Sequence, residues 1–439
     1  MSFLDELAAR RRFGMRSGLE TIRKLCAALD DPQQKFKAIH VAGTNGKGAV
    51  CAILDAALRN VRMDECSNVR MRIGRCTSPH LVKINERFFL DGAPIDDEAL
   101  ERVAERVSSN IQTFEHSDIT FFEALTAVAF ELYAEAKVDY AILECGLGGR
   151  LDATNVCDPA LSVITRIGLD HCDWLGDTLE KIATEKAGIV KIGVPIVLGR
   201  NEPEVVDVVR RRAEEVGAPF RYAPDLADES EIPSDFSLPG SFNRENAVTA
   251  LAALRVFAAC GEGGEMRWRW TVELPASVVW PGRFQRVGDF IVDGAHNPPA
   301  ARALVAALSA FNLQPLTFNL IFGACGDKDV GEVLSILAPI VKKGCAVRTN
   351  NPRSLSAEET AAKMRAAGID AIACASLKEA IELTRGTRHE AQGTTLICGS
   401  LFLAGEALVE LGAYPWGAPR FDKAELLRPD PCVLPQDRV

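Results

Sequence analysis

The chain is poor in aromatic residues, contains no pair of cysteines spaced C-x-x-C, and has no apolar stretch long enough to cross a membrane. Aromatic residues make up 7% of the sequence, and the cysteines number 13, an odd count. Without C-x-x-C pairs, neither a zinc site nor a disulfide framework is expected. The N-terminus lacks the apolar segment of a signal peptide, and no apolar run reaches the roughly 18 residues of a membrane span. These absences predict a cytoplasmic protein with reduced thiols.

A surplus of positive charge is also missing. The formal net charge is −10, whereas a protein that binds nucleic acid needs a basic face to displace counterions. Hydrophobic residues at 47% and charged residues at 25% are typical of a soluble enzyme, and 439 residues are too many for one compact core. We therefore expect a soluble enzyme of two or three domains that acts on small molecules, with no nucleic-acid or membrane partner. Nothing in the sequence demands more than a monomer.

Strand-like runs alternate with helical patterns over most of the chain. This alternation is typical of a mostly parallel sheet with helices on both faces, in which ligand groups collect at the carboxyl edge. We predict an α/β fold, in which the glycine-rich segment over residues 43–48 indicates a P-loop-type ATPase domain, followed by a smaller Rossmann-like α/β domain. The predicted strands cover residues 38–42, 138–143, 161–167, 194–198 and 290–292.

A domain boundary is expected just after Trp280-Pro281-Gly282-Arg283, where a second α/β series begins. We assign residues 1–284 to the first domain and 285–413 to the second. Residues 414–439 hold five prolines and little periodic pattern, so a loose tail is expected there. Residues 223–240 are expected to form an excursion or an extended hairpin, ahead of a helix over 243–259.

Residues 37–58 join an apolar strand to a glycine-rich turn and an amphipathic helix. Gly43, Gly46 and Gly48 allow close backbone approach, and a helix start presents unpaired N–H groups with a partial positive charge. The order of strand, turn, Lys47 and helix favours a phosphate cradle over a plain glycine turn with an exposed lysine. The loop departs from a standard Walker A motif, because Gly48 stands where a serine or threonine is needed and Val41 where a glycine is needed.

Carboxylate and imidazole groups follow two of the predicted strands. Glu144 closes one strand and Asp170-His171 follows the next, in places suited to magnesium, which prefers oxygen ligands. The competing interpretations are a solvated acid at a strand end and a capping histidine. Ser78 in Thr77-Ser78-Pro79-His80 could supply the missing hydroxyl, although spacing alone would make it a turn cap.

Several phrases together identify a family. The loop AGTNGKG, the phrase TSPHLVKINERFFLDGAPI, the phrase EKAGI and the stretches WPGRFQ and VDGAHNP occur in family order. They resemble the folate branch of the ATP-dependent Mur ligase superfamily over roughly residues 10 to 410. The resemblance implies an ATP- and magnesium-dependent ligase that joins L-glutamate to a pterin-linked carboxylate through an acyl phosphate. GLGGRLDATN is similar to the form in enzymes with both dihydrofolate synthase and folylpolyglutamate synthase activities.

The same resemblance implies roles for individual residues. Magnesium ions, two of them expected, would be held by Ser78, Glu144, His171 and a carbamylated Lys186. The residues expected to act in catalysis are Lys47, carbamylated Lys186, His171 and His296. ATP would be bound by Thr44, Asn45, Gly46, Lys47, Gly48, Ala49, Asn246, Arg283 and Asp293. Folate would be bound by Phe121, Phe122, Glu123, Leu151, Asp152 and Ala153, and glutamate by His296 and Ser400.

Three alternatives to a bifunctional ligase stay open. A monofunctional dihydrofolate or folylpolyglutamate synthase would share these residues. A peptidoglycan Mur ligase with a UDP-linked acceptor is disfavoured by the TSPHL and FFEALT phrases. A degenerate nucleotide-binding regulator would not need every metal group that the chain retains.

The chain departs from the family pattern at two places, position 49 and the segment 60–76. Ala49 stands where the family usually has serine or threonine, which removes a hydroxyl near the phosphates. Residues 60–76 hold four arginines, and we favour an ornamented loop over a contact with the polyglutamate tail. These are Arg62, Arg70, Arg72 and Arg75.

Overall fold

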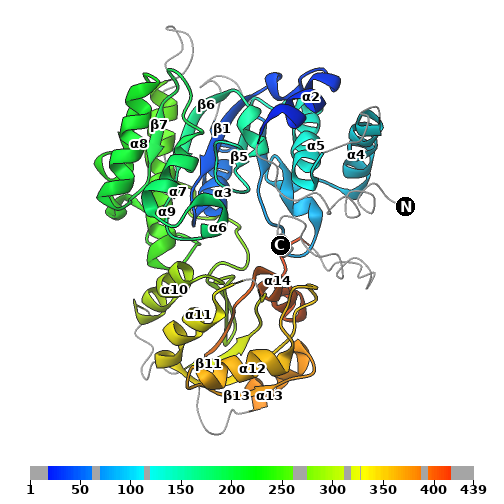
Figure 1. Cartoon of the computed structure of the whole chain (residues 1–439), viewed down its shortest axis with the longest axis vertical. Helices are drawn as coiled ribbons and strands as arrows, with labels where there is room; N and C mark the ends of the chain where they lie inside the picture. Colours follow the sequence, from blue (N-terminus) through cyan, green and yellow to red (C-terminus); the bar gives the residue numbers. More distant parts are fainter. Residues whose placement is uncertain are drawn as a thin grey trace.

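The chain folds into two α/β units, one above the other in Figure 1. The structure is a computed structural model. It describes residues 18–61, 70–112, 119–260, 274–310, 318–326, 328–386 and 394–416. No helix among these residues is long and apolar enough to span a membrane.

The first unit is built on an eight-stranded sheet in the order β4-β3-β2-β5-β1-β6-β7-β8. All pairs from β2 to β8 are parallel, and β3 and β4 add an antiparallel edge. The strands are β1 Lys37–Ala42, β2 Ile73–Cys76, β3 Phe88–Leu90, β4 Ala93–Pro94, β5 Tyr140–Glu144, β6 Pro159–Ile164, β7 Ile196–Leu198 and β8 Phe220–Tyr222. Because β1 lies between β5 and β6, the loops that follow these three strands meet at one edge.

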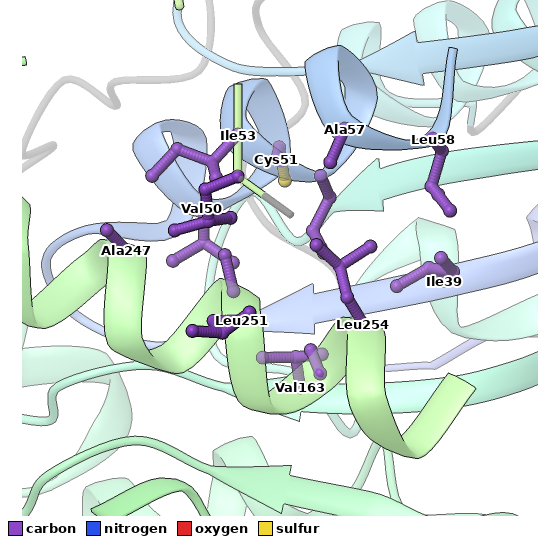
Figure 2. Packing of buried hydrophobic residues seen from close by; sticks show 14 of the residues in the cluster. Ile39, Val50, Cys51, Ile53, Ala57, Leu58, Val163, Ala247, Leu251 and Leu254 are labelled. Atoms are coloured by element: carbon purple, nitrogen blue, oxygen red, sulfur yellow. The ribbon is translucent and has the colours of Figure 1, made fainter. Parts of the chain in front are cut away.

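Helices cover both faces of this sheet. They are α2 Glu20–Ala28, α3 Lys47–Leu58, α4 Asp97–Gln112, α5 Phe121–Ala136, α6 Cys172–Leu175, α7 Leu179–Ala187, α8 Pro203–Glu215 and α9 Ser241–Ala259. Alternate residues of β1 point to opposite faces, so Ile39 packs under α3 and α9 while Ala38 belongs to the core under α2, α4 and α5. Figure 2 shows Val50 of α3 and Leu251 and Leu254 of α9 meeting above β1. The phosphate-loop helix therefore packs beside α9 on the same face of the sheet.

The second unit has a six-stranded sheet in the order β13-β12-β11-β14-β10-β9, parallel except for β9. Its strands are β9 Gln285–Val287, β10 Phe290–Val292, β11 Phe318–Phe322, β12 Val341–Ala346, β13 Asp370–Ala373 and β14 Thr395–Cys398. Its helices are α10 Pro298–Ala310, α11 Val330–Leu337, α12 Ala357–Ala366, α13 Leu377–Gly386 and α14 Leu401–Glu410. Helices α10, α11 and α12 enclose one core, and α13 and α14 the other.

The predicted α/β architecture is confirmed, with differences at strand ends. β6 ends at Ile164 rather than at 167. The Thr165 N–H still donates to the carbonyl of Ala42, the last residue of β1, at 2.9 Å, whereas the carbonyl of Arg166 already accepts from the phosphate loop. β5 includes Glu144 as its last residue instead of ending before it. The boundary at 284/285 stays a prediction; β9 begins at Gln285.

Three other expectations need correction. Residues 223–240 contain two short 3₁₀ turns, Ala223–Asp225 and Glu229–Glu231, so the excursion is present but the hairpin is not. Of the basic segment, residues 62–69 lie outside the described chain, and Arg75 is a buried residue of β2 rather than part of a loop. Of the expected loose tail, residues 417–439 lie outside the described chain, whereas Tyr414 and Trp416 have defined partners in the first unit.

Candidate active site

The phosphate loop is tied to the chain that leaves β6. The backbone N–H groups of Thr44 and Asn45 donate to the carbonyl of Arg166 at 2.9 and 3.2 Å, and the Thr165 hydroxyl donates to the Asn45 carbonyl at 2.7 Å. Gly46 precedes α3 with φ 86°, a left-handed conformation that favours glycine. The first N–H groups of α3 have no partner within the helix, so they present a site for phosphate oxygens.

Two glycines of the loop are packed against side chains from distant segments. A Cβ built on Gly46 would lie 2.2 Å from Asn246 Oδ1 of α9, and one on Gly48 would lie 2.2 Å from Trp280 Cζ2. A side chain at position 48 would therefore require the loop or the Trp280 ring to move. Ala49, the next residue, is 4% exposed.

Lys47, Glu144 and Ser78 surround the space beside this loop. The Lys47 amine donates to the Thr44 carbonyl at 3.2 Å, and the backbone N–H of Ser78 donates to Glu144 Oε2 at 2.9 Å. Glu144 is 4% exposed, and burial raises the pKa of its carboxyl, while Lys47, the Ser78 N–H and Arg283 oppose that rise. A buried carboxylate with cations around it is suited to neutralise a metal and to lie beside phosphate.

Lys186 enters the same site from α7. Its amine is 3% exposed and donates to the carbonyl of Gly43 at 2.8 Å. Burial, together with the nearby charge of Lys47, lowers the pKa of Lys186 to about 7. The lowered pKa favours the neutral amine, and only the neutral amine can react with carbon dioxide. The side chain is therefore chemically suited to the carbamylation that the family resemblance implies.

A second cluster joins the two units. Asp170, in the loop after β6, accepts a hydrogen bond from Asn297 Nδ2 at 2.9 Å and lies 3.6 Å from the Lys328 amine, and both partners belong to the second unit. Burial alone would raise the pKa of Asp170, but His171, Lys328 and His296 outweigh it and hold the pKa at about 2. Asp170 therefore stabilises this domain joint above its ordinary pKa of 3.8, and the contribution is lost as the pH falls towards 2.

Asn297→Asp is expected to loosen the domain joint. The new carboxylate can still accept from the Ala300 N–H at 2.9 Å, but it faces Asp170 as a like charge instead of a donor. Since a hydrogen bond to a charged group contributes about 1.5–3 kcal/mol, the variant should show a larger radius of gyration in X-ray scattering. Asn110→Asp on α4, away from the joint, is the control, and equal radii for both variants would contradict the prediction.

His171 and His296 lie near this joint in different settings. His171 has φ 52°, its side chain is 38% exposed, and its Nε2 lies 3.9 Å from Asp170. His296 Nδ1 is 2.7 Å from the carbonyl of Gly294, and burial lowers its pKa to about 4. Because a carbonyl only accepts, the neutral His296 ring carries its proton on Nδ1, and Nε2 keeps a lone pair.

Arg283 occupies the junction between the units. Burial lowers the pKa of Arg283, and the carboxylates of Asp293 and Glu144 oppose that effect, which places all three charges near one another. Asp293 itself accepts the backbone N–H groups of Phe284 and Ala295, each at 2.7 Å. The Asp293 carboxylate thus fixes the chain around Arg283, whatever it contributes to nucleotide binding.

The first three predicted folate residues fall in two environments. Phe121 is a core residue, whereas Phe122 lies against the loop after β5, where a Cβ on Gly146 would be 2.6 Å from its ring. Glu123 accepts from the N–H and the hydroxyl of Thr120, both at 2.8 Å, and so closes the N-terminus of α5. Phe122 is the one of the three that faces the site loops.

The other predicted ligand residues also have local partners. Asp152 accepts the backbone N–H of Leu147 at 2.9 Å and of Thr154 at 3.0 Å, which shapes the loop that contains Leu151 and Ala153. Ser400 Oγ accepts from the Phe402 N–H at 3.1 Å and begins α14. Their roles toward folate and glutamate remain predictions.

The donor groups fit a divalent metal held together with phosphate. Among the described residues, no three His, Cys, Asp or Glu side chains gather into a metal cluster. Only two of the predicted metal ligands, Glu144 and His171, are residues of these types. The other two predicted ligands are the Ser78 hydroxyl and the carboxylate that carbamylation would form on Lys186. Hard divalent cations prefer such oxygen ligands and commonly share phosphate oxygens.

Sequence reasoning missed the residues that act across long distances. Trp280 served only as part of the predicted domain boundary, and Lys328 was not singled out from the sequence. Glu86 and Arg87 belong to the TSPHLVKINERFF phrase, where Arg87 Nε donates to His80 Nδ1 at 2.9 Å. Glu86 is 6% exposed and Arg87 is 2% exposed. The sequence pattern does not indicate this burial, because a charged residue in an alternating segment is normally expected to face solvent.

Comparison with known proteins decides the family. The Mur ligase middle-domain model matches residues 41–215, and the Mur ligase glutamate ligase domain model matches 282–401. A Bacillus subtilis protein named dihydrofolate synthase/folylpolyglutamate synthase is 34% identical over 361 residues, covering 75% of this chain and 81% of the relative. The chain belongs to the folate branch of the Mur ligase family. The sequence prediction of this family, and with it of an ATP-dependent amide-forming ligase, is confirmed.

Solved structures of this Mur ligase branch share the fold over nearly the whole chain. Escherichia coli FolC in complex with DHPP and ADP has a TM-score of 0.79 at 30% identity, covering 94% of this chain and 98% of that one. The Yersinia pestis bifunctional folylpolyglutamate synthase/dihydrofolate synthase, complexed with AMPPNP and a Mn ion, has a TM-score of 0.78 at 28% identity. The match covers 94% of this chain and 98% of the Yersinia pestis chain.

Proposed function

We propose that this Mur ligase adds L-glutamate to dihydropteroate and to tetrahydrofolate, using ATP and a divalent metal, as a bifunctional dihydrofolate synthase/folylpolyglutamate synthase. The observation that carries the proposal is the convergence of Lys47, Glu144 and Lys186 beside one phosphate loop, at the junction with the glutamate ligase domain. The Bacillus subtilis relative bears both synthase names. The nucleotide and manganese of the Yersinia pestis structure support the same requirements.

The proposed reaction needs no protein nucleophile. The γ-phosphoryl group passes from ATP to the acceptor carboxylate and forms an acyl phosphate, and the glutamate amine then displaces phosphate to form the amide. In this proposal Lys47 and Arg283 neutralise the phosphoryl oxygens. The bound metal, expected as two magnesium ions, would add Lewis-acid charge neutralisation, held by Ser78, Glu144, His171 and carbamylated Lys186.

The attacking amine must lose a proton as the amide forms. His296 is the proposed acceptor because its ring is neutral at working pH; burial lowers its pKa to about 4, which keeps a lone pair available but also makes the ring a weaker base. Its Nδ1 is engaged by the Gly294 carbonyl, so Nε2 is the accepting atom. Closure at the domain joint excludes water, which would otherwise hydrolyse the acyl phosphate.

The acceptor is proposed to lie along the loop after β5. The far end of the Phe122 ring lies beside Gly146, and the buried Asp152 accepts from Leu147 of the same loop. A flat pterin suits an aromatic wall, and a carboxylate can accept from its amino and ring N–H groups. The glutamate would enter from the second unit, near His296.

Glutamate-dependent ADP release tests the proposal. Purified protein receives ATP and magnesium with dihydropteroate or tetrahydrofolate in separate reactions, each with and without L-glutamate. Turnover with both acceptors is the expected result. Turnover with one acceptor identifies a monofunctional synthase. Nucleotide binding without turnover on either acceptor overturns the proposal in favour of a regulator or of a ligase with a different acceptor.

A further inference from the structure

The loop that carries Ser78 is held from two sides. From below, the Ser78 N–H bonds to Glu144, and the Thr77 N–H donates to the Arg87 carbonyl at 3.1 Å. From above, the loop touches the second unit, because a Cβ on Gly405 of α14 would lie 2.5 Å from the Leu81 carbonyl oxygen. In Figure 1, α14 lies at the edge of the second unit that faces the first. The Ser78 loop, residues 77–83, is therefore an inter-domain contact as well as a part of the site.

One buried carboxylate shapes this loop. Glu86 accepts the backbone N–H groups of Leu81 at 2.7 Å, Val82 at 2.9 Å and Lys83 at 2.7 Å. It is 6% exposed and lies in the short turn Ile84–Arg87. Three successive N–H groups converge on it, so the position of the carboxylate fixes the backbone just beyond Ser78.

A fourth donor reaches Glu86 from the far end of the chain. The Tyr414 hydroxyl donates to Glu86 Oε1, across 328 residues of sequence. Trp416 stands edge-on to Phe89 of β3 at 5.3 Å between ring centroids, and to Tyr414 at 5.6 Å. Residues 414–416 thus return from the second unit and dock on the first; we call them the C-terminal latch.

We infer that Tyr414 is a positioning residue for the metal–nucleotide site: through Glu86 it holds the Ser78 loop where Ser78 meets Glu144. The inference rests on the proposed function, since it gives Ser78 its place among the metal ligands. Tyr414 touches neither Ser78 nor the phosphate loop in any described contact, so it acts through the backbone of residues 81–83. A charge-assisted bond in a buried setting is strong enough to select one loop position.

Tyr414→Phe tests the inference, because it removes one oxygen and keeps the ring packed against Trp416. We would measure ADP binding to the full chain by calorimetry at increasing magnesium concentration. The expected result is about a tenfold rise in the magnesium concentration needed for half-maximal binding, with little change in ADP binding without metal. Tyr222→Phe, at the half-buried end of β8, is the matched control and should leave the magnesium requirement unchanged.

A double-mutant cycle separates positioning from general stability. In a Ser78→Ala background the hydroxyl is gone, so adding Tyr414→Phe should raise the magnesium requirement no further. A lower melting temperature with an unchanged magnesium requirement, or additive effects in the cycle, would overturn the inference. Failure of the proposed function is seen separately, as wild-type protein that binds ADP and magnesium but shows no glutamate-dependent turnover.

Discussion

Lys186→Met is expected to abolish glutamate-dependent ADP release, by at least about a thousandfold, and to leave the fold intact. The amine is almost fully buried against the phosphate loop, where a methionine of similar length can fill its space. Only the carboxylate formed from the lysine can ligate metal, and the thioether cannot. A positioned metal supplies several kcal/mol of transition-state stabilisation, which corresponds to about three orders of magnitude in rate.

The stability of this variant gives the prediction its control. Burial lowers the pKa of Lys186 to about 7, below its unfolded value of 10.5, so the unfolded chain binds more protons at this position between those two pH values. The contribution of Lys186 to the free energy of unfolding therefore rises with pH between about 7 and 10.5. Below pH 7 the full cost of burying the charged amine lowers the stability of the folded chain. Methionine carries no such penalty, so the melting temperature at pH 7 should be equal or higher.

Lys181→Met makes the same chemical change on an exposed part of α7, where the lysine only pairs with Asp177. It should retain wild-type turnover. Lys186→Glu, which supplies a shorter carboxylate, should recover part of the activity that Lys186→Met loses. Retention of more than about a tenth of wild-type turnover by Lys186→Met would contradict the role assigned to this residue.

Gly48→Ser, which restores the hydroxyl of a standard Walker loop, is expected to weaken ATP binding rather than strengthen it. The new Cβ would have to occupy space 2.2 Å from the Trp280 ring, so the loop or the indole must move. Overpacking of this kind costs about 1–3 kcal/mol, or roughly ten- to a hundredfold in ATP affinity if the loop moves. Titration calorimetry with a non-hydrolysable ATP analogue measures it.

A second-site change tests the cause. Trp280→Ala opens space at the ring position, so Gly48→Ser combined with Trp280→Ala should bind the analogue better than Gly48→Ser alone. Gly331→Ala in α11 has no atom closer than 3.8 Å to the added carbon and serves as the control. If the double variant binds no better than the single one, the contact with Trp280 is not what excludes a side chain at position 48.

Local sequence patterns predicted the parts of the site that are continuous along the chain. The strand, turn and helix around Lys47 follow from hydrophobic spacing and glycine placement, and Glu144 was placed because parallel strands end at one edge. The ends of β5 and β6 were less predictable. Beyond Thr165 the carbonyl of Arg166 accepts from Thr44 and Asn45 of the phosphate loop, and that contact is not visible in the sequence pattern of the strand itself.

Contacts between distant segments could not be predicted. Trp280 packing on Gly48, Asn297 reaching Asp170, and Tyr414 reaching Glu86 each depend on how two units dock. The polar residues Asp152, Asp293 and Ser400 were proposed as ligands on family resemblance, and the structure adds that each one also orders its own loop or helix start. Residue type alone does not distinguish a ligand-binding role from a role in ordering the local backbone, because both need a carboxylate or hydroxyl beside a turn.

During synthesis, the C-terminal latch can bind the first unit only after the phosphate loop has been made. A ribosome adds about 5–20 residues per second and N-terminal domains generally fold first. The phosphate loop can therefore be complete while Tyr414 has not yet been made. Until that residue emerges, the Ser78 loop lacks the donor that fixes it. A nascent chain can thus assemble its nucleotide pocket early, whereas the bond between Tyr414 and Glu86 forms only after residue 414 has emerged.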